Sequence, residues 1–201
     1  GLVSCNSNSE SDTPDLGPDK SLNQRGLGQS ANELLSAAEY SALRIEIQYV
    51  EGFAPPSSSV GYLRNFLEER LNKPEGITIT LEEVVSEGLS IYSIDKIRAI
   101  EDEKRRAYNE GNTIAAYFYF VDGAYQTNPN ALGVAHRNTS MVIFQEKIQE
   151  LSGGLGQVST ELLTSAVMSH EFGHILGLVD VGSPMVNDHK DEANGAHCDN
   201  Q

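Results

Sequence analysis

The pattern that decides the fold begins at residues 42–49, which read Ala42-Leu43-Arg44-Ile45-Glu46-Ile47-Gln48-Tyr49. Apolar and polar side chains alternate along this stretch, and a period of two is typical of a half-buried β-strand. Residues 58–72 then show apolar positions at helical spacing, and residues 77–81 predict a second strand. This succession of strand, helix and strand is typical of parallel strands joined by a helical crossover.

The alternation of strands and helices continues toward the C-terminus. The further expected elements are a helix of residues 93–110, a strand of residues 113–121, and two short strands of residues 132–136 and 141–144. A last helix follows, which Ser159 or Thr160 can cap. We therefore expect an α/β (α+β) fold with a mixed, mostly parallel five-stranded sheet. This sheet has one antiparallel edge strand, and the fold also contains two backing helices and the last helix.

This last helix carries the motif His170-Glu171-Phe172-Gly173-His174-Ile175-Leu176-Gly177-Leu178-Val179-Asp180. Residues four apart lie on one face of a helix, so His170 and His174 can direct their imidazoles at one metal ion. Glu171 lies beside them and can take a proton from a water molecule on that ion. Catalytic zinc sites combine such ligands with one open position. The spacing predicts a zinc ion bound by the two histidines, with Glu171 as general base.

A third ligand is expected where the chain leaves this helix. Gly177 readily takes the left-handed conformation that ends helices, so the chain can turn there and bring Asp180 back to the metal. His189 and His197 are alternatives, because either could replace Asp180 or bind a second ion.

The pattern HExxHxxGxxD of residues 170–180 resembles the extended zinc signature of the metzincin clan of metallopeptidases, in its variant with aspartate as third ligand. The resemblance implies a metzincin-like zinc endopeptidase that cleaves protein or peptide substrates through metal-activated water, with Glu171 as base. It also implies an edge strand that pairs with an extended substrate. That edge strand would be formed by Leu132, Gly133, Val134 and Ala135.

The part of the chain after the motif departs from the metzincin pattern. Metzincins carry a methionine in a tight turn beneath the metal, and Met185 lies only five residues beyond Asp180. His197-Cys198 resembles a segment that precedes a Cys-x-Met motif in archaemetzincin-like sequences. By that resemblance, the methionine turn, the specificity pocket and a partner for Cys198 would lie beyond Gln201. The C-terminal subdomain would then be short or truncated.

The N-terminal residues predict an anchor. Leu2-Val3-Ser4-Cys5 resembles the lipobox of bacterial lipoproteins, in which the cysteine is lipidated. Residues 6–30 are rich in Ser, Asn, Asp and Gly, a composition that forms no core. We expect residues 1–36 to be a lipobox remnant and flexible tether, and residues 37–201 to be a catalytic domain. The protein would be exported to the bacterial cell envelope and held at the outer membrane or cell surface through Cys5.

Composition limits the partners. The formal net charge of −15 argues against nucleic acid, whose phosphates are bound by clustered lysine and arginine. No apolar run approaches the roughly 20 residues that cross a bilayer, so only a lipid anchor would join the protein to a membrane. The acidity leaves Ca²⁺ as a second candidate ion, although the chain has neither an EF-hand loop nor glycine-aspartate repeats. We expect a monomer.

Two alternatives stay open beside the zinc endopeptidase. A non-catalytic surface lipoprotein with a structural or vestigial zinc site would need ligands but no base, and a fourth ligand from His189 or His197 would favour it. A gluzincin-type peptidase would take its third ligand from a later glutamate such as Glu192. The Gly177 and Asp180 spacing argues against that alternative, and so does the polar sequence of residues 187–195.

Overall fold

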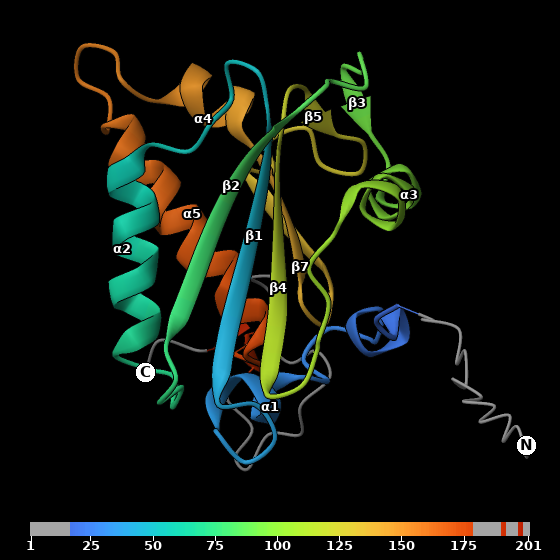
Figure 1. Cartoon of the computed structure of the whole chain (residues 1–201). Helices are drawn as coiled ribbons and strands as arrows, with labels where there is room; N and C mark the ends of the chain where they lie inside the picture. The colour runs from blue at the N-terminus through green and yellow to red at the C-terminus, as the bar shows by residue number, and fades with distance from the viewer. Residues whose placement is uncertain (1–16, 179–189, 192–196, 199–201) are drawn as a thin grey trace, which may run out of the picture.

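The central sheet has five strands in the order β2-β1-β4-β7-β6. A computed structural model describes residues 17–178, 190–191 and 197–198 (Figure 1). The strands are β1 (Ala42–Val50), β2 (Ile77–Val84), β4 (Thr113–Val121), β6 (Gly133–Arg137) and β7 (Ser140–Phe144). Neighbours from β2 to β7 are parallel, while β6 is antiparallel to β7 at one edge. The predicted mixed sheet with one antiparallel edge strand is confirmed.

Helices cover both faces of this sheet. α2 (Ser57–Glu68) and α5 (Thr160–Ile175) lie on one face, and α3 (Ile94–Lys104) lies on the other (Figure 1). Because both faces are covered, the central strand β4 is buried along almost its whole length. Its side chains alternate between two cores, with Ile114, Ala116, Phe118 and Phe120 toward α5 and Tyr117, Tyr119 and Val121 toward α3.

Several short elements complete the described part of the chain. They are η1 (Lys20–Asn23), α1 (Ala31–Leu35), β3 (Ile91–Tyr92), β5 (Ala124–Tyr125), α4 (Gln145–Leu151), β8 (Lys190–Asp191) and β9 (His197–Cys198). None of them was expected from periodicity, because each is too short to show a period. None of the helices that the structure describes is long and apolar enough to cross a bilayer.

Two expected helices end earlier in the structure. α2 stops at Glu68 rather than at residue 72, and α3 stops at Lys104 rather than at residue 110. Arg105 leaves the helical conformation with ψ 133°, and its side chain turns inward to Glu101 and the carbonyl of Ala115. A buried tertiary partner therefore ends α3, and no helix-breaking residue marks that point in the sequence.

The second half of the segment that we expected to be a tether packs against the domain. Leu34 is fully buried, and so is Asn23, whose side chain donates to Asn109 Oδ1 at 2.7 Å and to the Ala115 carbonyl at 3.0 Å. Polar residues that read as a solvated linker are here satisfied by the domain. Residues 1–16, with Cys5, lie outside the described residues.

A buried polar cluster joins α3 to the edge of the sheet. Glu101 accepts hydrogen bonds from Arg105 at 2.8 Å, from Arg137 at 3.0 Å and from the Ser140 hydroxyl. The ring of His136 lies beside it, with Nδ1 3.8 Å from Glu101 Oε2, and neither ring nitrogen has a hydrogen-bond partner. The cluster holds β6 and β7 in position against α3.

The burial of His136 predicts a loss of stability in mild acid. Burial lowers the pKa of His136 to about 4, although Glu101 acts in the opposite direction. The unfolded chain therefore takes up this proton first, and the contribution of the neutral ring is fully present above pH 6.5. As the pH falls from 6.5 toward 4, we expect a loss of about 3 kcal/mol in the free energy of unfolding. Urea denaturation across this range measures it.

The matched variant for this measurement is His136→Gln, which cannot take up a proton. Its free energy of unfolding should change less than that of the wild type over the same pH range. Equal pH dependence in the two proteins would contradict the assignment of this loss to His136.

Candidate metal centre

Helix α5 is held firmly at its start and along its inner face. The Ser159 side chain caps it by accepting a hydrogen bond from the Leu162 amide at 3.2 Å, which confirms one of the two expected caps. Met168, Phe172 and Ile175 are fully buried, and the Phe172 ring stacks on Phe118 of β4 with centroids 6.3 Å apart. This packing leaves the opposite side of the helix facing the edge strand and solvent.

The end of α5 has the backbone pattern that Gly177 predicted. Gly177 has φ 77°, its amide donates to the His174 carbonyl at 3.1 Å, and the Leu178 amide donates to the Gly173 carbonyl at 3.1 Å. These two bonds form a Schellman motif, in which a left-handed residue turns the chain away from the helix axis. The chain therefore leaves the helix at Gly177, three residues after its second histidine.

The remaining predicted residues of this region lie outside the described residues. They are Asp180, Met185, His189 and Glu192. The backbone of His197 belongs to β9, which pairs antiparallel with β8, and its side chain is outside the description as well. The assignment of a third ligand thus stays a prediction.

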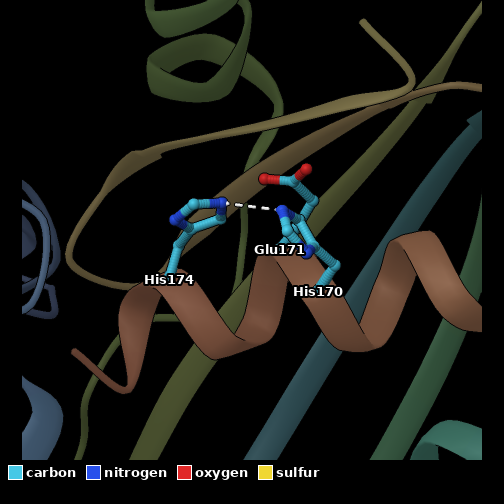
Figure 2. A group of neighbouring side chains, drawn as sticks. All are labelled: His170, Glu171 and His174. Carbon is cyan, nitrogen blue, oxygen red and sulfur yellow. Dashed lines mark hydrogen bonds between the residues drawn. The ribbon is translucent and has the colours of Figure 1, made fainter. Parts of the chain in front are cut away.

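His170 and His174 face one another across one turn of α5. Their Nε2 atoms are 3.1 Å apart, and the rings are nearly perpendicular at 83° (Figure 2). Two nitrogens bound to one tetrahedral zinc ion, each at 2.0–2.1 Å, would be separated by roughly 3.3 Å. The candidate ligand atoms of the two histidines and Glu171 all lie within 4.8 Å of one another. The pair therefore fits a zinc ion.

Glu171 differs from the two histidines because it is buried. Only 5% of its surface is exposed, and burial raises the pKa of its carboxyl to about 7, while a hydrogen bond from the Ala135 amide acts in the opposite direction. A cation held by the histidines would lower this pKa again by attracting the charged form. The charged carboxylate that a bound cation favours is the form that can accept a proton.

The edge strand β6 presents its free backbone groups to Glu171. The Leu132 carbonyl accepts a hydrogen bond from the Phe144 amide at 2.9 Å, in the register that pairs Gly133 with Ile143. Backbone groups alternate in direction along an antiparallel pair, so those of Gly133 and Ala135 point away from β7. The bond from the Ala135 amide to Glu171 agrees with this direction.

Gly133 allows this close approach because it has no side chain. A Cβ atom added there would lie 2.6 Å from Glu171 Cγ, closer than van der Waals contact permits. A cavity of about 380 Å³ opens beside this contact. Its lining consists of Leu132, Gly133, Ala166, Val167, His170 and Glu171.

The structure thus brings together predicted residues from two distant parts of the sequence. Leu132, Gly133 and Ala135 of the edge segment meet His170 and Glu171. Val134 faces the other side of the sheet, toward the core beneath α3. The sequence reasoning missed Ala166 and Val167 as lining residues, although Ala166 precedes His170 by one helical turn and could have been placed on the same face.

The fold and the site define a mixed α/β protein with a candidate zinc centre on a helix beside an antiparallel edge strand. No protein-family model matches the chain, and no curated protein matches it. Among solved structures, the crystal structure of archaemetzincin from Methanopyrus kandleri is similar at 18% sequence identity and a TM-score of 0.47. The match covers 69% of this chain and 76% of that chain. The proposed function therefore rests on the site of this chain.

We predict that the protein binds one zinc ion through the histidine pair. His170→Ala or His174→Ala should weaken zinc binding by more than about 100-fold, because a lost ligand costs more than a lost outer-shell partner. Competition with a chromophoric zinc chelator, together with elemental analysis, measures this. Ser169→Ala is the matched control on the same helix, since its buried hydroxyl has no hydrogen-bond partner. Zinc binding that survives both histidine variants would refute the site.

Proposed function

We propose that the protein is a zinc-dependent endopeptidase of the metzincin type. The observation that carries this proposal is the placement of a buried Glu171 carboxyl between a converging histidine pair and the free backbone edge of β6. Asp180 is the proposed third ligand, following the spacing of the motif. Imidazole ligands favour zinc over calcium, which prefers oxygen.

The chemistry divides between the ion and the protein. When bound, zinc polarises a substrate carbonyl and lowers the pKa of a coordinated water molecule to roughly 7. Glu171 accepts the proton of the water that attacks the carbonyl carbon, and it then delivers that proton to the leaving amine nitrogen. Its burial excludes bulk water, and a cation held by the histidine pair would favour its charged form, which is the form that accepts the proton.

The edge strand supports a peptide as substrate. An extended peptide laid beside β6 can pair with the outward backbone groups of Gly133 and with the Ala135 carbonyl, as in strand addition to an exposed sheet edge, while the Ala135 amide is bonded to Glu171. Backbone pairing of this kind holds a peptide through groups that every residue has. β6 runs from Gly133 to Arg137, so the edge continues past the contact with Glu171 on the Arg137 side. A peptide paired along this edge would extend beyond the site on that side, as a substrate of an endopeptidase does.

The non-catalytic alternative explains less of the site. A structural zinc site needs ligands alone and gives no reason for a carboxyl buried beside them, since burial of such a group costs free energy. We also propose that the protein is located at the bacterial cell envelope and is anchored there by a lipid on Cys5. This part of the proposal is based on the lipobox-like sequence of residues 2–5.

The role of Glu171 is tested by the variant Glu171→Gln. We expect it to bind zinc but to lose at least about 100-fold in kcat, because the amide cannot accept the proton. Hydrolysis of casein by the zinc-loaded proteins measures this, with zinc content determined on the same samples. Glu161→Gln, in the first turn of the same helix, should leave cleavage unchanged.

Two results would contradict the proposal. Cleavage by Glu171→Gln at the wild-type rate would remove the assigned base. A zinc-loaded wild type that cleaves neither casein nor gelatin would remove the endopeptidase activity of this chain.

Gly133→Ala tests the contact between the edge strand and the base. The new methyl group would meet Glu171 Cγ at 2.6 Å, so the carboxyl must move. A displacement of about 1 Å can cost up to about 100-fold in rate, and we expect a loss of at least about tenfold in kcat with zinc binding retained. Gly61→Ala in α2 is the control, since its Cβ meets nothing within 4 Å. Unchanged kcat in Gly133→Ala would show that Glu171 tolerates the shift.

A further inference from the structure

A second cavity, of about 530 Å³, opens at the edge of the sheet beside β6. Three elements contribute arginines to its lining: the N-terminal segment gives Arg25, α3 gives Arg98 and β6 gives Arg137. Val134 and His136 of β6 belong to the same lining, and both face the α3 side of the sheet. We call this cavity the arginine pocket.

The charge of the arginine pocket is opposite to that of the protein. The chain has 14 basic and 29 acidic residues, yet the pocket lining holds three arginines and no acidic residue. Arg25 is paired with Glu33, and Arg137 is paired with Asp102 at 2.6 Å. Arg98 forms no ion pair with a carboxylate within the described part of the chain, so its charge is available to a ligand.

Arg98 is also held in position by the edge strand itself. One of its guanidinium nitrogens donates to the His136 carbonyl at 2.9 Å. A guanidinium has five N–H donors, so the others remain available for a carboxylate, which it can bind with two parallel hydrogen bonds. Because the side chain is already anchored, less conformational entropy is lost when a carboxylate binds.

The edge strand connects this pocket to the metal centre. In an extended peptide, successive side chains point to opposite faces of the sheet. A peptide paired with Gly133 and Ala135 would therefore direct alternate side chains toward the zinc centre and toward the α3 side. Those on the α3 side meet the arginine pocket along residues 134–137.

We propose that the arginine pocket is a second substrate subsite, in which Arg98 binds the carboxylate of an aspartate or glutamate side chain of the peptide. This inference rests on the proposed peptidase function and names the substrates that the same site prefers. This aspartate or glutamate of the peptide lies on the part of the substrate that runs from the cleaved bond toward the Arg137 end of β6. Its immediate neighbours in the peptide point to the other face and carry no such preference.

The test compares peptides that differ by one charge. Each peptide is acetylated, amidated and otherwise uncharged, and holds a single Glu or Gln at one of the four positions on either side of the cleaved bond. We expect Glu to raise kcat/KM about five- to tenfold over Gln at one position, through KM, and the adjacent positions to show no difference. Equal cleavage of the Glu and Gln peptides at every position would overturn the subsite.

Variants at Arg98 assign the preference to this side chain. Arg98→Gln should abolish the preference for Glu, and Arg98→Glu should invert it toward Lys at the same position. Arg70→Gln, at an exposed arginine after α2, should leave the preference at the wild-type value. A preference that survives in both Arg98 variants would overturn the assignment.

Direct binding separates this inference from the peptidase activity. Fluorescence anisotropy of labelled peptides on Glu171→Gln measures affinity without cleavage. If no peptide is cleaved by the wild type but the Glu peptide binds more tightly in an Arg98-dependent way, the peptidase proposal fails and the subsite stands. If only peptides with a free C-terminal carboxylate bind more tightly, the side-chain assignment is wrong. Equal affinity for Glu and Gln peptides also overturns it.

Discussion

The contact between Glu171 and the edge strand β6 is the constraint on which the site depends. A buried carboxyl under a strand requires a position without a side chain above it and a backbone donor within reach, and Gly133 and Ala135 supply these. The contact sets how closely α5 approaches the edge of the sheet. That distance in turn determines where the histidine pair lies relative to any peptide added to β6.

The two faces of β6 contact different parts of the molecule, because side chains alternate in direction along a strand. On the α5 face, the small residues Gly133 and Ala135 leave room for the candidate metal centre. On the α3 face, His136 is buried beside Glu101, and the arginine pocket opens next to it. The ion pair of Glu101 with Arg137 joins α3 to this strand, so the candidate metal centre and the arginine pocket lie on the two faces of one strand that α3 holds in place.

Local patterns predicted the elements whose causes are local. The strand of residues 113–121 was predicted to the residue, because its β-favouring side chains need no distant partner to mark its ends. The predicted end of α3 at residue 110 was wrong, because Arg105 leaves the helix and its side chain joins a buried polar cluster. Residues 17–36 pack on the domain rather than forming the predicted flexible tether. The hydrogen bonds of the Asn23 side chain go to Asn109 and Ala115, which are far along the chain and could not be paired with it from local sequence.

By itself the sequence determined the pairing of His170 with His174, the place of Glu171 beside them and the turn at Gly177. Those features follow from the helical period and from the conformational freedom of glycine, which act over a few residues. Only the tertiary structure decided that Gly133 lies over Glu171 and that three arginines from separate elements line one pocket. Such contacts join residues far apart in the chain, and packing of helices on the sheet brings them together.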